Sequence, residues 1–178
     1  MHGMASILLD SIARRSSRDI VSITLVAGAQ ALATALSTKA DEPALTTLDV
    51  SHNALLPEGV APLVQAIATC GRLQHLKLGH NGIRDEGFQV VAGLVGSDEC
   101  SLNTLDLSHN MGTMIGLTHL ARALGSNNRL VQVNVRGNDW GDEAGTVLAQ
   151  HLRSGFNFEL QHLVRVWYGY VCGVSNLR

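Results

Sequence analysis

The chain has 178 residues, of which 46% are hydrophobic and 16% charged, and this composition excludes an intrinsically disordered polypeptide. Such a length suffices for one domain with a sizeable core. The formal net charge of −2 gives no electrostatic basis for binding nucleic acid or an anionic membrane surface. The three cysteines are far apart and form no CxxC pair, which argues against that kind of zinc site and indicates a reducing compartment. We therefore expect a cytoplasmic protein without a cofactor.

The N-terminal residues 1–19 are predicted to form a capping helix, because apolar side chains recur from Met4 to Ile12. Arginines and serines in this segment also resemble a mitochondrial presequence, against which Asp10 counts.

The following segment, Ile20–Thr38, carries no charged residue and admits three interpretations. It resembles a signal peptide, and it is about as long as a membrane span. Polar residues such as Ser22 and Gln30 make it a poor hydrocarbon segment. Residues 20–25 also fit the start of the repeats that follow, so we favour a shortened repeat over residues 20–44.

A pattern L-x-x-L-x-L-x-x-N then occurs four times, in copies that begin at Leu45, Leu73, Leu102 and Leu130. The intervals are 28, 29 and 28 residues, and a fifth start follows at Leu160. Alternating apolar residues predict a short strand at the start of each copy. Repeat positions are counted from this first leucine, and residues 45–159 are predicted to form four full repeats.

The second half of each repeat has a helical pattern. A small residue stands fourteen places after the first leucine in every copy: Gly59, Gly87, Gly116 and Ala144. Apolar or small residues follow mostly three, four, seven and eight places later, which predicts one buried face of an α-helix. We expect Asp85 and Asp142 to act as N-caps of the helices that follow them.

These units predict an α/β fold, a right-handed solenoid in which parallel strands line the concave side and helices the convex side. Neighbouring units must stack, because no single strand–helix unit can bury its apolar face. The asparagines at position 9 are expected to turn inward and satisfy backbone groups at the strand ends: Asn53, Asn81, Asn110 and Asn138. The whole of 1–178 is predicted to be a single domain.

Three departures from the pattern carry predictions of their own. Gly112 stands where the other repeats have an apolar residue, and we expect Met111 or Met114 to fill the gap. Trp140 is expected to pack in the core. The repeat frame is lost soon after the fifth start, so residues 160–178 are predicted to be either a degenerate repeat or an aromatic C-terminal cap.

The chain resembles the leucine-rich-repeat family, and within it the ribonuclease-inhibitor-like subfamily. The resemblance rests on the period near 28, the strand motif and the G-x-x-x-L-x-x-x-L helix, and it covers residues 45–159 strongly and 20–44 partially. Family members include the ribonuclease inhibitor, innate-immune receptor repeats, tropomodulin-like actin caps and the GTPase-activating protein of Ran. The resemblance implies protein recognition through a curved surface, as an adaptor or scaffold. Its alternative implication is regulation of a small GTPase.

Positions 3, 5, 7 and 8 should face solvent on the concave side, because strand side chains alternate. The mixture of charges and hydroxyls there suits a protein partner better than phosphates, which would require clustered Lys and Arg. We expect no nucleic-acid or membrane partner, although open solenoid ends could also associate with a second copy. The candidate partner-binding residues are Thr47, Asp49, His52, His75, Lys77, His80, Thr104, Asp106, His109, Asn134 and Arg136.

Position 8 holds His52, His80 and His109, which should form a ladder because neighbouring strands lie about 4.8 Å apart. A metal- or pH-responsive module is therefore a second alternative. Parallel rings do not converge on one ion as tetrahedral zinc requires, so we favour a protein contact and expect no metal. Although Asp49 and Ser51 lie near histidines, we find no triad, G-x-S-x-G elbow or phosphate loop, and expect no enzyme.

Overall fold

The computed structural model describes residues 45–154 and four short strands within 162–164, 166–167, 170–171 and 174–175. The predicted capping helix over 1–19 and the shortened repeat over 20–44 lie outside the described residues. None of the helices in the described part of the chain combines the length and hydrophobicity that crossing a lipid bilayer requires.

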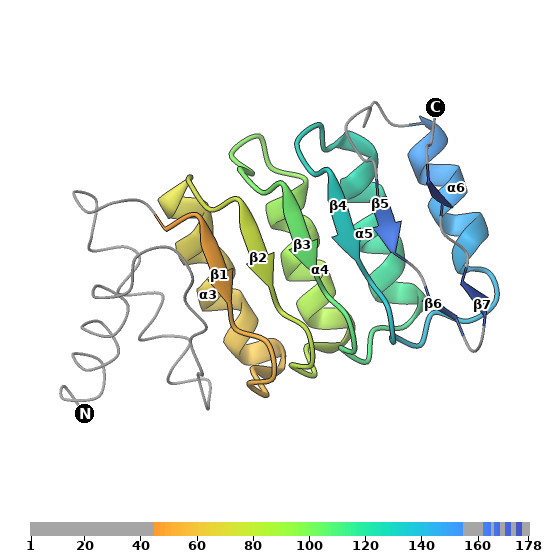
Figure 1. The fold of residues 1–178 in the computed structure, drawn as a ribbon, viewed down its shortest axis with the longest axis horizontal. Helices are drawn as coiled ribbons and strands as arrows, with labels where there is room; N and C mark the ends of the chain where they lie inside the picture. Colours follow the sequence, from red (N-terminus) through yellow and green to blue (C-terminus); the bar gives the residue numbers. More distant parts are fainter. Residues whose placement is uncertain (1–44, 155–161, 165, 168–169, 172–173, 176–178) are drawn as a thin grey trace.

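Four strand–helix units follow one another along the chain, as the repeats predict (Figure 1). They are β1 Thr47–Asp49 with α3 Leu56–Cys70, β2 His75–Lys77 with α4 Arg84–Val95, β3 Thr104–Asp106 with α5 Met114–Ser126, and β4 Gln132–Asn134 with α6 Ala144–Ser154. Each strand runs parallel to the next, with residues at equal repeat positions paired, such as Leu48 with Leu76. The helices all lie behind one face of the sheet, which is the α/β solenoid expected (Figure 1).

The sheet continues beyond the four repeats. Strand β5, His162–Val164, pairs in parallel register with β4, and β8, Val174–Ser175, pairs antiparallel with β5. Strands β6, Val166–Trp167, and β7, Tyr170–Val171, form a separate antiparallel pair. The C-terminal segment thus supplies a fifth repeat strand and an antiparallel edge strand, and its role as a cap stays a prediction.

The core lies between the sheet and the helices. Apolar residues at positions 4 and 6 of the four repeats, such as Leu48, Leu76 and Val135, are at most 2% exposed. On the helices, Leu63, Val91 and their equivalents meet them from the other layer. Full burial of one such aliphatic side chain contributes roughly 1.5–3 kcal/mol, so the periodic apolar residues supply the main driving force for stacking.

The asparagines at position 9 turn inward along the strand ends, as predicted, and we call them the asparagine ladder: Asn53, Asn81, Asn110 and Asn138. The first three are buried and the fourth is half-buried. Asn81 is 1% exposed, and its Oδ1 accepts the N–H groups of Asn53 at 3.0 Å and Leu55 at 3.3 Å in the preceding repeat. Its Nδ2 donates to the carbonyls of Val50, Leu78 and Gly79. One side chain therefore satisfies backbone groups of two repeats.

The space beside Gly112 is filled by aromatic rings and not by Met111, which is 63% exposed. Phe88 from α4 and Trp140 from the fourth repeat meet there edge to face, with ring centroids 5.0 Å apart. A Cβ on Gly112 would lie 2.5 Å from the Phe88 ring, so only glycine leaves room for both rings. Met114 is partly buried and packs against the core. Trp140 is buried, as predicted, and donates its indole N–H to Val135.

The prediction that Asp85 caps its own helix is wrong. Helix α4 begins one residue before it, at Arg84, and shows no side-chain cap. The Asp85 carboxylate instead accepts hydrogen bonds from the N–H and hydroxyl of Thr113 and from the N–H of Gly116, at 2.6–3.0 Å. The carboxylate thus satisfies N–H groups at the start of α5 that have no acceptor within the helix. Its negative charge is also attracted to the positive N-terminal end of the helix dipole. Helix α3 has the common signals at its two ends. Pro57 lies in its first turn, and Gly71 adopts the left-handed conformation after its last residue.

Candidate functional site

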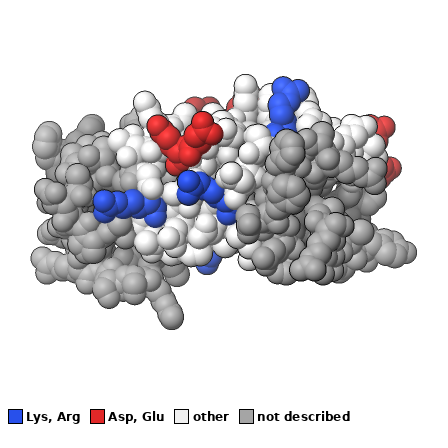
Figure 2. Space-filling view, turned by 90° about the horizontal axis from the view of Figure 1, so that it is seen from above, with Lys and Arg blue, Asp and Glu red and all other residues white. Residues whose placement is uncertain are grey.

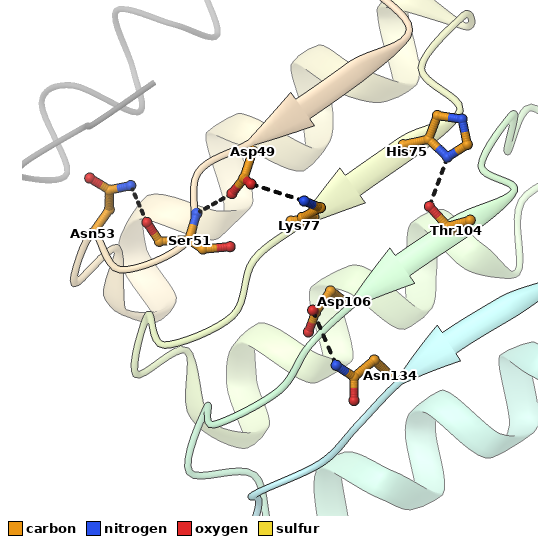
Figure 3. A network of polar contacts seen from close by, with 8 residues as sticks. All are labelled: Asp49, Ser51, Asn53, His75, Lys77, Thr104, Asp106 and Asn134. Atoms are coloured by element: carbon orange, nitrogen blue, oxygen red, sulfur yellow. Dashed lines mark hydrogen bonds and ion pairs between the residues drawn. The ribbon is translucent and has the colours of Figure 1, made fainter. Parts of the chain in front are cut away.

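The candidate site is the sheet face that no helix in the described part of the chain covers, and we call it the concave face (Figure 1). Its residues stand at positions 3, 5 and 8 of β1 to β4 and the turns after them. The parallel register aligns equal positions of neighbouring repeats, so the side chains form three rows across the strands. Figure 3 shows the position 5 row, His75 and Thr104 of the position 3 row, and the hydrogen bonds that connect them across neighbouring strands.

The position 5 row connects the repeats in pairs. The carboxylate Oδ2 of Asp49 lies 3.2 Å from Nζ of Lys77, and Oδ2 of Asp106 accepts a hydrogen bond from Nδ2 of Asn134 at 3.1 Å (Figure 3). The Lys77 side chain is 53% exposed, whereas that of Asp49 is 19% exposed. Lys77 is therefore the charged residue of this pair that a partner reaches more easily.

The other carboxylate oxygen of the two position 5 aspartates accepts a backbone N–H two residues further along the chain. Oδ1 of Asp49 accepts the N–H of Ser51 at 3.1 Å, and Oδ1 of Asp106 accepts that of Ser108 at 2.9 Å. Burial raises the pKa of the Asp49 carboxyl, but hydrogen bonds from Ser51 and Lys77 lower it more, so the pKa lies below its ordinary value of 3.8. The Asp49 carboxylate therefore stays ionised at neutral pH, and both carboxylates hold the turn after their own strand.

The position 3 row is weakly polar. Nδ1 of His75 lies 2.8 Å from the hydroxyl of Thr104 on the next strand, and both residues are half-buried (Figure 3). Thr47 and Gln132 stand in the same row at its two ends. A partner that contacts this row would meet hydroxyl, amide and imidazole groups without a fixed charge.

The position 8 row is the histidine ladder, His52, His80 and His109, and its three side chains are exposed. The ring centroids lie 4.3 and 4.2 Å apart, with interplanar angles of 14° and 11°, so the rings stack almost in parallel. All three residues have positive φ, between 53° and 62°, a conformation in which histidine is enriched compared with most side chains. The parallel stacking confirms the predicted ladder, and rings in this arrangement do not converge on one metal ion.

The ladder ends at Gly137, which occupies position 8 of the fourth repeat. Its φ is 70°, and a Cβ built on it would overlap the ring of His109. The His109 ring therefore lies directly over the glycine backbone. The sequence motif did not reveal this contact, although the change from histidine to glycine at an otherwise constant position was visible in it.

Position 7 departs from the expectation that it faces solvent. Ser108 is 8% exposed and Gly79 is also buried, whereas Arg136 is exposed. The strands end before this position, so strict alternation no longer sets the side-chain direction there. A Cβ on Gly79 would lie 3.0 Å from Oγ of Ser108, so neighbouring turns approach each other closely.

The polar groups of the concave face do not assemble into a hydrolytic arrangement. Asp49 bonds Ser51 and Lys77, and Asp106 bonds Ser108 and Asn134, so both carboxylates are engaged away from an imidazole. Cys100 is buried, and burial raises the pKa of its thiol against the hydrogen bonds that lower it. Within the residues that the structure describes, no group of three His, Cys, Asp or Glu side chains could hold a metal ion.

Figure 2 shows acidic and basic side chains among uncharged ones on one face of the described part of the molecule, without a large patch of one sign. On the concave face, the exposed cations Lys77 and Arg136 alternate with the carboxylates of Asp49 and Asp106. This pattern is unfavourable for an evenly charged polyphosphate chain.

Comparison with known proteins places these features in a family. A model of the leucine-rich repeat matches residues 43–64 and 73–92. The chain is 34% identical over 108 residues to the capping protein, Arp2/3 and myosin-I linker protein 2 of Mus musculus. The aligned region covers 57% of this chain and 8% of the relative. It is 30% identical over 109 residues to the NACHT, LRR and PYD domains-containing protein 14 of Mus musculus, covering 61% of this chain and 11% of the relative.

A third relative is the ribonuclease inhibitor of Sus scrofa, 32% identical over 127 residues, or 71% of this chain and 27% of the relative. The matched region therefore spans between 8% and 27% of the length of these three relatives. The repeat motif, the parallel sheet backed by helices and these similarities agree on one conclusion. The chain is a leucine-rich-repeat protein of the ribonuclease-inhibitor-like kind.

Proposed function

We propose that this chain is a protein–protein interaction module that binds a partner protein through the concave face and the adjoining loops, as an adaptor or scaffold. The observation that carries the proposal is the uncovered sheet face. Four parallel strands present aligned rows of polar side chains on it, while the helices occupy the opposite face. The strands pair their backbones with one another, so a partner that approaches this face meets these side chains.

The similarities support this proposal in a general way. The name of the mouse linker protein refers to capping protein, Arp2/3 and myosin-I, and the name of the pig relative refers to ribonuclease. Both names describe proteins that act on other proteins. We infer the same class of activity for this chain, and we infer neither of those partners.

The candidate partner-binding residues divide into two groups by exposure. His52, Lys77, His80, His109 and Arg136 are exposed. The half-buried ones already bond their neighbours in most cases: Thr47, Asp49, His75, Thr104, Asp106 and Asn134. We propose that the exposed group makes the direct contacts and that the second group shapes and orients the face.

A charge-reversal experiment tests the proposal. The full chain would be immobilised and used to capture proteins from native extract at neutral pH, beside a K77E/R136E variant that changes two exposed concave cations. The control variant R72E/R122E changes two exposed arginines, one in the loop before β2 and one on helix α5, by the same total charge. Loss of a captured protein only with K77E/R136E supports binding through the concave face. Equal capture by all three proteins removes this face as the binding surface.

A further inference from the structure

The concave face carries a balance of charge that histidine alone can change. Positions 3, 5, 7 and 8 of the four described repeats hold two acidic and two basic residues of fixed charge. These are Asp49, Asp106, Lys77 and Arg136. The same positions hold four histidines: His52, His75, His80 and His109. The formal charge of the face is therefore zero when the histidines are neutral, and it becomes positive as they bind protons.

Three of these four histidines form the exposed stack. Protonation of neighbouring rings 4.2–4.3 Å apart places like charges side by side, so the middle ring resists it most. The groups that act on His80 are His52 from the turn after β1, His109 from the turn after β3, and Asp106 from β3 itself. The pKa of His80 lies below 6.5, chiefly because the ring is partly dehydrated and also because His109 and His52 repel its positive charge. The carboxylate of Asp106 acts in the other direction and raises this pKa. On the far side, His109 contacts the uncharged backbone of Gly137, which follows the cation Arg136.

A bound anion relieves this repulsion. A carboxylate placed against the outer edges of the stacked rings would stabilise their protonated form, and protonation and binding would then favour each other. A regular polyphosphate is a poorer occupant, because it would bring evenly spaced charges close to the carboxylates of Asp49 and Asp106. A polypeptide can present acidic side chains opposite the ladder and neutral or basic ones opposite these two carboxylates.

We propose that the concave face binds an acidic segment of a partner protein, and that it does so when the histidine ladder is protonated in mildly acidic surroundings. This inference rests on the proposed function and specifies both the chemistry of the partner and the control of its binding. When its histidines are neutral, the ladder presents uncharged aromatic edges and the formal charge of the face is zero. In acid, the same surface becomes a row of hydrogen-bond donors with positive charge.

The test uses the full chain and a fluorescently labelled peptide of alternating aspartate and glycine, followed by fluorescence anisotropy. Aspartate stays ionised through this range, because its ordinary pKa is about 3.9. We expect the affinity to rise about tenfold or more as the pH falls from about 7.5 to about 5.5, and to weaken with added salt. An affinity that does not change over this range would overturn the proposal.

Variants connect the pH dependence to the ladder. Asparagine cannot be protonated and tolerates positive φ, so H52N/H80N/H109N keeps the turn conformation and removes the titrating groups. We expect this variant to lose the acid-induced binding, and H119Q on helix α5 to retain it. Circular dichroism and thermal melting at both pH values check that each variant is folded. If the triple variant does not fold, the single changes H52N and H109N serve instead, and each is expected to weaken binding at the lower pH.

Two further outcomes would overturn the proposal. One is acid-induced peptide binding that persists in a folded ladder variant, and the other is tighter binding of a single-stranded oligonucleotide of equal charge than of the peptide. These outcomes are separate from the failure of the proposed function. Capture at neutral pH that depends on Lys77 and Arg136 would leave the concave face as a binding surface even if the acidic peptide never bound.

Discussion

Two ladders run side by side through this molecule, one residue apart in the sequence and opposite in their surroundings. Three of the four members of the asparagine ladder are buried, and the side chain of Asn81 alone makes five hydrogen bonds to backbone groups. The histidine ladder is exposed, and its rings contact each other. Both recur at the repeat spacing in the sequence, asparagine in all four repeats and histidine in the first three. Regularity therefore indicates stacking of repeats, and only burial distinguishes residues that hold the fold from residues available to a partner.

The largest effect is expected from N81A, which removes the side chain at the centre of the asparagine ladder. The N–H groups of Asn53 and Leu55 would lose the Oδ1 acceptor in a buried site. The carbonyls bonded by Nδ2 would each lose one of two donors, since Nδ2 of Asn53, for example, also donates to the carbonyl of Val50. Each buried unsatisfied group costs about 1–3 kcal/mol, so we expect the free energy of unfolding to fall by about 3–5 kcal/mol after partial relaxation. Urea denaturation followed by circular dichroism measures it. A loss below about 1 kcal/mol would contradict the structural role of this ladder.

A smaller effect is expected from G137A, at the place where the histidine ladder ends. The new Cβ would overlap the His109 ring, and alanine at a φ of 70° is strained. We expect a loss of about 1–2 kcal/mol in the free energy of unfolding, because the exposed ring can move aside while the backbone strain remains. G141A, at a φ of 64° with open space around its Cβ, is the control for backbone strain alone. Equal losses in the two variants would show that the His109 contact contributes nothing.

The replacement H80N is expected to change stability very little. His80 is exposed, and asparagine accepts the left-handed conformation that this turn requires. We expect a change within about 0.5 kcal/mol at neutral pH, as for most exposed positions. The same urea denaturation as for N81A gives a direct comparison between neighbouring residues of the two ladders. A loss as large as that of N81A would mean that the stacked rings also hold the fold.

The smallest effect is a dependence of stability on pH that belongs to the histidine ladder. The pKa of His80 in the folded chain lies below 6.5, its ordinary value. The unfolded chain therefore binds the proton more readily, and the contribution of His80 to stability is complete above pH 6.5 and is lost as the pH falls through the lowered pKa. We expect a small decrease in the unfolding midpoint in acid that is reduced in H80N. An identical decrease in both proteins would assign it to other groups.

The sequence predicted the strand–helix units and the direction of most of their side chains. Its apolar residues recur at the spacing that buries one side of each strand and helix, as Leu48 and Leu63 illustrate. Asn81 was predictable for a related reason, since a polar residue fixed at the end of an apolar strand must satisfy the backbone there. The concave rows followed from alternation along β1 to β4, although alternation failed at Ser108, beyond the end of β3.

Other features depend on partners that lie one or more repeats away. The carboxylate of Asp85 was expected to serve its own helix, but it bonds the start of the next one. The second oxygen of Asp106 has a similar neighbour in Asn134. A pattern within one repeat contains no information on such contacts, because they depend on the offset between stacked units.

The amino-acid sequence by itself determined the repeat length, the parallel stacking and the identity of the core, because burial of periodic apolar groups admits one arrangement. Only the tertiary structure decided how the irregular positions are accommodated. Phe88 and Trp140 meet across Gly112, and His109 rests on Gly137, because close packing leaves each gap to whichever neighbouring side chain can reach it.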